Sequence, residues 1–517
     1  MSATRRKTLV SIALVLAAGF AILARCNRLP ANTNRIASSV IVDTAGTRLE
    51  RAVTALRAGH PNVSSIHALR DARDAFTVRY LLANRAERTL DVQYYIWRDD
   101  LSGTLLMKAL LDAADRGVRV RLLLDDNNTA GLDEGLAAID SHPRIEVRLF
   151  NPFVLRGARA VGYLTDFPRL NRRMHNKSFT ADNQVTVIGG RNVGDEYFGA
   201  TDDVLFADLD VIGIGPVVSD VSRDFDRYWA SESSYPANRL LPSPSGAALG
   251  DLSAKASRVA REPAAVAYLK ALRESSFVGQ LNARTLPFEW AATRLISDPP
   301  AKVLGRAARE ELLAQKFAEI FGTPAAELDL VSPYFVPGRR GVALFGDWAK
   351  RGVRVRVLTN ALESTDVAVV HAGYAKRREA LLEAGIRLYE LRRTSGPRPG
   401  RSTGSFGSSD SSLHAKTFAV DRSRIFIGSF NFDPRSAELN TEMGFVIDSP
   451  VLAGRIAEAF DTEVPRNAYE VTLSDGDVQW LERRGTLAIR HRTEPGTGFW
   501  QRLGVAVLSM LPIEPLL

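Results

Sequence analysis

Cysteine is nearly absent from this chain of 517 residues, because Cys26 is its only cysteine. A single cysteine excludes a disulfide bond within the chain, so cysteine usage says nothing about an oxidising compartment. It also excludes a zinc site built on several thiolates. Histidine is scarce as well, with seven in the whole chain. Any repeated placement of histidine is therefore informative.

The bulk composition excludes two classes of protein and indicates the charge of the partner. Hydrophobic residues make up 45% of the chain and charged residues 24%, which excludes disorder or a coiled coil for most of the length. The chain has 67 Lys and Arg against 59 Asp and Glu, a net charge of +8. This excess favours an anionic partner, either nucleic acid or an acidic membrane surface.

The N-terminal residues have the pattern of an export signal. Basic residues 5–7 precede an apolar run over 8–24, a little short of the ~20 residues of a transmembrane helix. The positive-inside rule places the basic end in the cytoplasm. The pattern predicts that 1–26 anchors the chain in a bacterial cell envelope, with the remainder on the periplasmic side. The residues that end at Cys26 resemble a lipobox, but Arg25 stands where a small residue is expected, so a lipoprotein and an uncleaved anchor both stay open.

An internal repeat divides the chain into two halves. Three segments recur in the same order in both halves. A buried strand at 90–97 matches 328–335, the sequence Arg-Gly-Val-Arg-Val-Arg at 116–121 recurs at 351–356, and a further strand at 147–150 matches 386–389. The glycine closes a helix and the alternating valines begin the next strand. A repeat of this length indicates duplicated domains rather than a solenoid.

The repeat predicts an α/β fold of two similar lobes related by a pseudo-two-fold axis, each a mixed sheet flanked by helices. The predicted divisions are an N-terminal signal or anchor at 1–26, a first lobe at 27–242, a connecting insertion at 243–326 and a second lobe at 327–517. Helical patterns within the insertion cover 254–274 and 302–321. Residues 392–412 are rich in Gly, Ser, Pro and Arg, and they predict a mobile loop.

Two of the seven histidines lie in matching motifs of the form His-x-Lys-x4-Asp. The first motif is His175, Lys177 and Asp182, and the second is His414, Lys416 and Asp421, 239 residues further on. Residues i and i+2 of a strand project from the same face, so each histidine and lysine project together. Each aspartate lies at the far end of its strand, where a turn begins. We take all six residues as candidate catalytic residues.

Each motif is followed by a glycine-containing strand end and an asparagine. Asn192 and Asn431 both lie 17 residues after their histidine, and their amides are candidates to bind a phosphate oxygen without adding charge. Two imidazoles provide one nucleophile and one general acid. Two ammonium groups and two amides provide donors for a phosphoryl group. The sequence shows no separate cluster of carboxylates, and it predicts neither a metal nor a cofactor.

At these residues the chain resembles the phospholipase D superfamily, whose mark is the duplicated motif. The resemblance covers about 90–465, and 332–337 and 172–197 are similar to the bacterial cardiolipin synthase branch, closest to its C-type members. The closing stretch 510–514 is similar to that branch as well. The resemblance implies two phospholipase D-type lobes that build one active site.

The resemblance also implies a mechanism through a phosphohistidine. One histidine attacks phosphorus, while the other protonates the leaving alcohol and then activates the acceptor. We assign attack to His175 and acid–base work to His414, although the symmetry of the motifs leaves the reverse open. The family places an acid behind each histidine. Glu442 fits this role in the second lobe, and in the first lobe we favour Asp208 over Asp203.

The function expected from the resemblance is phosphatidyl transfer that makes cardiolipin from phosphatidylglycerol and a phosphatidyl donor. An apolar tail over 499–517 supports a partner surface of anionic phospholipids, although the same pattern suits a helix that packs on the core. One alternative is a phospholipase that gives the phosphatidyl group to water. A nuclease is disfavoured, because no aromatic-plus-basic stacking pattern is found and no nucleic acid partner is expected. A lipid-binding scaffold with a dead site would have lost one motif, and both are intact.

Overall fold

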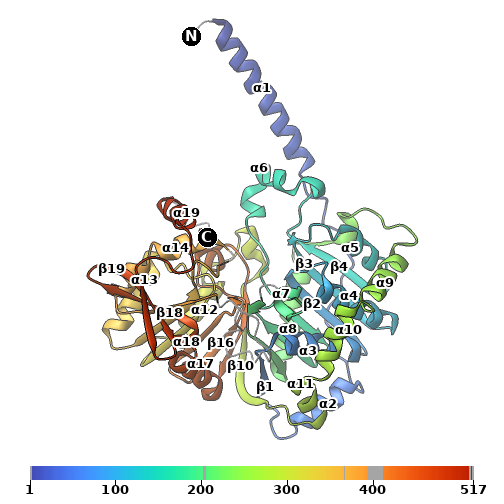
Figure 1. Cartoon of the computed structure of the whole chain (residues 1–517). Helices are drawn as coiled ribbons and strands as arrows, with labels where there is room; N and C mark the ends of the chain where they lie inside the picture. The colour runs from blue at the N-terminus through green and yellow to red at the C-terminus, as the bar shows by residue number, and fades with distance from the viewer. Residues whose placement is uncertain (1–2, 202–204, 366, 394–410, 512–513, 515–517) are drawn as a thin grey trace.

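The chain folds into two α/β lobes that lie side by side, with one helix projecting from the body (Figure 1). The computed structural model describes residues 3–201, 205–365, 367–393, 411–511 and 514. The lobes share an 18-stranded mixed sheet, in which both parallel and antiparallel neighbours occur. The predicted α/β architecture of two similar lobes is confirmed.

The first lobe holds eight strands of this sheet, in the spatial order β9-β4-β3-β2-β5-β6-β8-β1. The strands are β1 (Ser64–Leu69), β2 (Thr89–Ile96), β3 (Arg119–Asn128), β4 (Ile145–Phe150), β5 (Ser178–Ala181), β6 (Val185–Gly189), β8 (Asp210–Ile214) and β9 (Ser234–Pro236). The helices around them are α2 (Arg48–Arg57), α3 (Ala72–Arg85), α4 (Leu101–Asp115), α5 (Asp133–Asp140), α6 (Arg159–Leu170), α7 (Asp195–Phe198) and α8 (Pro216–Trp229).

The second lobe repeats this order and adds a hairpin, as β10-β17-β16-β15-β11-β12-β13-β18-β19-β20. Its strands are β10 (Glu289–Ser297), β11 (Glu327–Val331), β12 (Arg354–Asn360), β13 (Arg387–Leu391), β15 (Thr417–Val420), β16 (Arg424–Gly428), β17 (Met443–Asp448), β18 (Ala468–Ser474), β19 (Asp477–Arg484) and β20 (Leu487–His491). Its helices are α12 (Leu313–Phe321), α13 (Gly338–Lys350), α14 (Ala368–Ala375), α15 (Arg378–Glu383), α16 (Pro434–Glu438), α17 (Pro450–Thr462), α18 (Val464–Asn467) and α19 (Phe499–Met510).

Strands β1 and β10 join the lobes and mark the pseudo-two-fold axis. They pair antiparallel, with Ser65 opposite Trp290. On either side of this pair, β1 continues to β8 and β10 continues to β17, so the strand order outward is the same in both directions. The axis therefore passes between β1 and β10. Strand β10 belongs to this arrangement although it lies in the segment 243–326 that was predicted to be a connection.

The repeated strand sequences have a structural reason in one buried ion pair per lobe. Asp91 on β2 lies opposite Arg121 on β3, and their Oδ1 and Nε atoms are 2.7 Å apart. Asp329 on β11 and Arg356 on β12 repeat this pair at 2.6 Å. Because a buried charge is costly unless it is paired, each partner requires the other in the neighbouring parallel strand. The apolar residues between them fill the core on both faces of the sheet.

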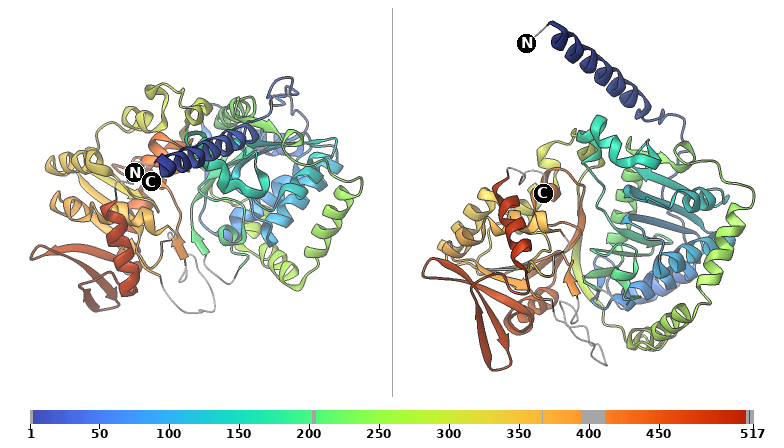
Figure 2. Two further views of the ribbon diagram at one scale, coloured as in Figure 1. Left: turned by 90° about the horizontal axis from the view of Figure 1, so that it is seen from above. Right: turned by 45° about the horizontal axis from the view of Figure 1, so that its top comes forward.

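The part of the connecting segment before β10 is helical and covers the first lobe. Helices α9 (Ala248–Val259), α10 (Pro263–Arg273) and α11 (Ser276–Ala283) follow one another, and α9 packs against α4 and α5 (Figure 2). The helix predicted over 302–321 is only partly present, because short 3₁₀ turns precede α12. Of the loop predicted over 392–412, residues 394–410 lie outside the described residues.

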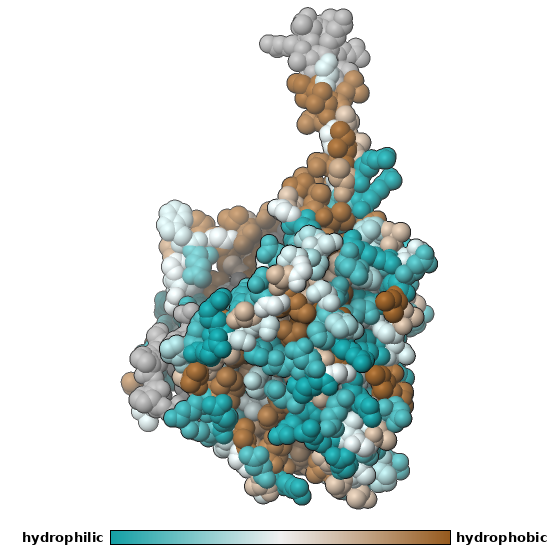
Figure 3. Space-filling view, turned by 90° about the vertical axis from the view of Figure 1, so that its right-hand side faces the viewer, coloured by the Kyte–Doolittle hydropathy of each residue, from teal (hydrophilic) through white to brown (hydrophobic). Residues whose placement is uncertain are grey.

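The N-terminal segment is a 24-residue helix, α1 (Ala3–Cys26), which projects away from both lobes (Figure 1). In the space-filling view, the described part of this helix is apolar over most of its visible surface (Figure 3). Among the described residues, no helix is both long enough and apolar enough to cross a membrane. Cys26 is exposed at the end of α1.

Candidate active site

The first motif begins in a segment that is held by the opposite lobe. His175 lies just before β5, and its backbone N–H donates to the carbonyl of Thr441 at 2.9 Å. The N–H of Thr441 donates in turn to the carbonyl of Arg173 at 3.0 Å. Arg173 is buried and its guanidinium is paired with Asp125. These contacts fix the approach of the chain to His175 before β5 begins.

The second motif is held in the same way by the first lobe. Strand β14 (Ser411–Leu413) pairs in parallel with β7 (Leu205–Ala207), and the N–H of His414 donates to the carbonyl of Ala207 at 2.8 Å. Each histidine therefore follows a short stretch of backbone pairing between the lobes. In each case the acid comes directly after the paired stretch of the other lobe. Glu442 follows Thr441 and lies beside His175, and Asp208 follows Ala207 and lies beside His414.

The two carboxylates are exchanged between the lobes. Nδ1 of His175 lies 2.8 Å from Oε2 of Glu442 in the second lobe. Nδ1 of His414 lies 2.5 Å from Oδ2 of Asp208 in the first lobe. Both acids are fully buried. The residues predicted as the acids thus lie at the imidazoles, and each histidine takes its acid from the other half of the chain. Asp203, the alternative to Asp208, lies outside the described residues.

The two acids have different surroundings, although their lobes are similar. Glu442 accepts hydrogen bonds from the hydroxyls of Ser429 at 2.5 Å and Ser436 at 2.8 Å. The place of Ser429 is taken in the first lobe by Gly190, where an added Cβ would lie 2.1 Å from an oxygen of Asp208. Within the described part of the chain, no hydroxyl side chain donates to Asp208. The backbone N–H of Leu209 donates to its Oδ1 at 2.7 Å.

These surroundings shift the pKa values of the two acids in opposite directions. Burial lowers the pKa of the His175 imidazole to about 4, so this ring is neutral at pH 7. Burial opposes ionisation of Glu442, but the neighbouring His175 and Lys177 and the Ser429 hydroxyl outweigh it and hold the pKa of Glu442 below its ordinary value. Burial raises the pKa of Asp208. An ionised Glu442 only accepts, so Nδ1 of His175 carries the proton and Nε2 carries the lone pair.

Both motif lysines are buried beside their histidines. Nζ of Lys177 donates to the carbonyl of His175 at 2.6 Å, and Nζ of Lys416 donates to the carbonyl of His414. Burial lowers the pKa of Lys177 well below its usual range, and the charge of Lys416 acts in the same direction. The charge of Lys416 also lowers the pKa of His175. Because each histidine is hydrogen-bonded to an acid of the other lobe, both motifs lie at the junction of the lobes.

The two asparagines lie at the ends of the strands that follow the motifs. Asn192 is buried after β6, and its Oδ1 accepts from the backbone N–H of Ile96 at 3.2 Å. Asn431 is buried after β16, and its backbone N–H donates to Ser436 at 3.3 Å. Ser436 is the same residue that donates to Glu442, so Asn431 is connected to the acid of His175.

The two motif aspartates lie at the far ends of their strands, where backbone N–H groups occupy their carboxylates. Asp182 follows β5 and accepts hydrogen bonds from three successive backbone N–H groups, those of residues 87–89, at 2.7–3.1 Å. Asp421 follows β15 and accepts from the N–H groups of residues 325–327 at 2.7–2.9 Å. Each carboxylate holds the start of the neighbouring strand, β2 or β11. The strand length separates it from the imidazole, so these residues fix the strand that carries the motif.

A buried ion pair supports Glu442 from a segment that the sequence did not single out. Asp298 follows β10, and its Oδ2 accepts from the N–H of Glu442 at 3.0 Å, while its own N–H donates to the Glu442 carbonyl. Nζ of Lys302 lies 2.9 Å from Asp298 and also donates to the carbonyl of Ser436. The spacing of four residues between Asp298 and Lys302 was the only available signal, and it is common on helices.

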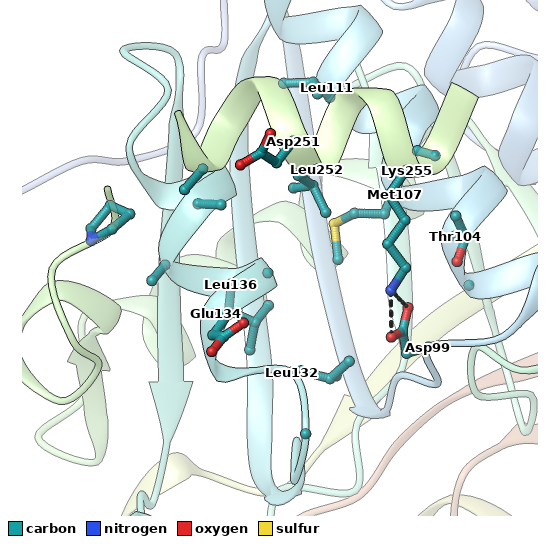
Figure 4. A pocket seen from close by; sticks show the side chains of 18 of the residues that line it. Asp99, Thr104, Met107, Leu111, Leu132, Glu134, Leu136, Asp251, Leu252 and Lys255 are labelled. Atoms are coloured by element: carbon teal, nitrogen blue, oxygen red, sulfur yellow. Dashed lines mark hydrogen bonds and ion pairs between the residues drawn. The ribbon is translucent and has the colours of Figure 1, made fainter. Parts of the chain in front are cut away.

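The structure also has a cavity that is separate from the candidate active site. A cavity of about 800 Å³ lies between α4, α5 and α9, with the ion pair of Asp99 and Lys255 at its edge (Figure 4). Neither motif histidine lines it, so it is separate from the candidate active site. Across the residues that the structure describes, no three His, Cys, Asp or Glu side chains gather as ligands for a metal ion.

Comparison with known families matches residues 81–229 and 319–464 to the family described as "Cardiolipin synthase, PLD-like domain". Cardiolipin synthase C of Escherichia coli (strain K12) is 52% identical over 475 residues, which cover 91% of this chain and 100% of that protein. Cardiolipin synthase A of Pseudomonas entomophila (strain L48) is 25% identical over 426 residues, which cover 82% of this chain and 73% of that protein.

Among solved structures, phosphatidylserine synthase of Haemophilus influenzae Rd KW20 is similar in fold, with a TM-score of 0.58. It is 14% identical in sequence and covers 91% of this chain and 100% of its own. This similarity supports the two-lobed fold alone. The sequence similarities extend over both lobes and both motifs.

Proposed function

The chain belongs to the family of cardiolipin synthases with phospholipase D-like domains, and we propose that it transfers a phosphatidyl group to the hydroxyl of phosphatidylglycerol to make cardiolipin. The predicted resemblance to this family is confirmed. The observation that carries the proposal is the pairing of each motif histidine with a buried carboxylate of the opposite lobe. This arrangement makes two imidazoles available in one site, which a two-step transfer requires.

In the first step, Nε2 of His175 attacks the phosphorus of a phospholipid. A P–N bond forms and the P–O bond to the head-group alcohol breaks. His414 gives its proton to the departing oxygen. The ring of His175 then carries both phosphorus and the Nδ1 proton, and its positive charge lies beside the carboxylate of Glu442. Lys177 and Lys416 neutralise charge on the phosphoryl oxygens, and the anionic phosphate favours the charged form of Lys177 that burial opposes.

In the second step, His414 accepts the proton of a phosphatidylglycerol hydroxyl as that oxygen attacks phosphorus. The P–N bond breaks, His175 regains its lone pair, and cardiolipin forms. If phosphatidylglycerol is also the donor, each cardiolipin leaves one glycerol. Asn192 and Asn431 are proposed to bind phosphoryl oxygens in both steps.

The different surroundings of the acids support His175 as the nucleophile. A nucleophile has to be neutral before attack, and burial lowers the pKa of His175 to about 4. The positive ring that attack creates requires an ionised partner, and two serine hydroxyls stabilise the Glu442 carboxylate. Asp208 lacks these hydroxyls among the described residues, which suits a histidine that holds a proton and gives it away.

A phospholipase that transfers the phosphatidyl group to water is the second candidate, because water attacks the same intermediate. We favour the transferase because a relative 52% identical over 91% of this chain is a cardiolipin synthase. We also propose that α1 anchors the enzyme in the cell envelope with both lobes on the periplasmic side, since residues 5–7 are basic. Labelling with radioactive palmitate tests whether Cys26 is lipidated, and we expect no label because Arg25 stands where a lipobox has a small residue.

The function is tested by incubating the purified full-length chain with labelled phosphatidylglycerol, with and without a second phospholipid. We expect labelled cardiolipin and free glycerol, and no product from the variant His175→Ala. Phosphatidic acid as the main product would make the chain a hydrolase. If neither product forms, the proposed function is wrong.

A further inference from the structure

The C-terminal helix α19 is packed on only one of its faces. Val505 is buried at 6% exposure and contacts a small apolar cluster with Leu362 and Ala372 of the second lobe. Leu508 packs against the same cluster. This inner face fixes α19 to α14. Of the two interpretations of the tail from the sequence, packing on the core therefore holds for this face.

The outer face of α19 is an exposed apolar stripe. Five residues at helical spacing face solvent, with 41–80% of their surface exposed: Phe499, Trp500, Leu503, Val507 and Met510. The helix contains no acidic residue, and Arg502 is its only charged residue. Aromatic and aliphatic residues on one face, with a basic residue and no acid, are typical of a helix that lies in a membrane interface.

A second exposed apolar group lies on the first lobe, on the same side of the molecule. Leu164 is 69% exposed and Phe167 is 46% exposed on α6. Two views show α6 and α19 on the side from which α1 projects (Figures 1 and 2). The end of α1 is tied to α6, because Nδ2 of Asn27 donates to the carbonyl of Gly162 at 3.2 Å and to Thr165 at 2.9 Å. Three apolar surfaces from distant parts of the chain thus face one way.

We propose that α6 and the outer face of α19 together form a docking surface that rests on a bilayer of anionic phospholipids. The bilayer nature of the partner rests on the proposed function, because the substrate of that reaction resides in a bilayer. The net charge of +8 complements an anionic surface. Because α1 leaves from the same side, an inserted α1 would bring this surface toward the lipid. One contact on each lobe would fix the orientation of the shared site.

The docking surface is tested by placing fluorescent labels at single cysteines. Cys26→Ser removes the only cysteine, and Val507→Cys or Leu164→Cys then places one label on the proposed surface. Val451→Cys is the matched control, because Val451 is 48% exposed on α17, at the end of the molecule away from α1 (Figure 1). A polarity-sensitive label is read with vesicles of phosphatidylglycerol and phosphatidylethanolamine, some of which carry a nitroxide in the acyl chain.

We expect a blue shift and nitroxide quenching at positions 507 and 164 and neither at position 451. Labels that respond equally at all three positions, or at none, would overturn the proposal. A response at position 507 without one at position 164 would remove α6 from the surface. These readouts do not require catalysis, so they stay informative if the proposed function fails.

Activity provides an independent readout of docking. Val507→Glu places a charge on the exposed stripe, and Val451→Glu is its control. Full burial of one aliphatic side chain corresponds to about tenfold or more in binding. We therefore expect Val507→Glu to lower cardiolipin formation on vesicles about tenfold, with little change on monomeric short-chain phosphatidylglycerol. Equal losses on both substrates would mean that α19 supports the fold, and they would contradict docking while leaving the function intact.

Discussion

The exchange of carboxylates between the lobes makes the two acids separable by experiment. Glu442→Gln keeps the size of the side chain and removes its charge. The Nδ1 atom of His175 and the Oε2 atom of Glu442 are 2.8 Å apart, so the charges of the phosphorylated ring and the carboxylate would be centred about 4 Å apart. At an effective dielectric constant of about 20, this attraction is about 4 kcal/mol. Each 1.36 kcal/mol changes a rate about tenfold, so we expect attack to slow about a thousandfold.

The assay measures formation of the covalent adduct and not only turnover. A nitrophenyl phosphodiester has an acidic leaving group that departs without a proton from His414, so its burst reports attack by His175 alone. Glu442→Gln should lose this burst, while Asp208→Asn should retain it and then stall, because His414 no longer activates the acceptor. Mass spectrometry of the quenched protein should place phosphorus on His175.

Two results would refute this reasoning. Equal bursts in Glu442→Gln and the unaltered chain would show that the carboxylate does not stabilise the ring. Loss of the burst in Asp208→Asn, with retention in Glu442→Gln, would make His414 the nucleophile. Circular dichroism and thermal unfolding of both variants control for folding, because both acids are buried and hydrogen-bonded.

Three further predictions follow from other parts of the site. In His414→Ala, the burst rate should stay constant from pH 8 to pH 5 and fall as the pH approaches the pKa of His175, about 4; a fall near pH 6.5 would show an ordinary histidine. Asp182→Asn should lower the free energy of unfolding by about 2–4 kcal/mol in chemical denaturation, because its carboxylate accepts three backbone N–H groups, yet leave the activity of the folded enzyme largely intact. EDTA should leave cardiolipin formation unchanged, because Lys177 and Lys416 supply the positive charge; complete loss that a divalent ion restores would contradict this.

The sequence was sufficient to predict the two lobes and the candidate site because duplication repeats both. Asp91 and Arg121 hold two strands of the first lobe together, and the same pair of charges recurs in the second lobe. The repeat can therefore be recognised in the sequence alone. The histidines and lysines recur at the same spacing. Asp208 does not follow this spacing, since the loop before it is longer than its counterpart in the second lobe. It was favoured because residues 207–210 align with residues 442–444.

Other features could not be predicted, because they depend on contacts between segments far apart in the chain. The spacing of a motif does not tell which lobe supplies the acid. The acid of His414 comes from the first lobe because Leu205–Ala207 pairs along the backbone with Ser411–Leu413. The support of Glu442 by Asp298 and Lys302 arises in a segment without a repeated counterpart in the sequence. Asp182 binds the backbone N–H groups at the start of the neighbouring strand, so a residue of the motif can stabilise the sheet that carries the site.

The exchange of acids has a consequence for the ancestry of the enzyme. A single lobe holds a histidine without its carboxylate and a carboxylate without its histidine, so an ancestor with one motif required a second copy of itself. Two identical copies around the axis between β1 and β10 would have had two identical imidazole–acid pairs. Joining two copies in one chain removes that identity. Gly190 and Ser429, and Asp208 and Glu442, could then diverge, and one histidine could specialise in attack while the other specialised in proton transfer.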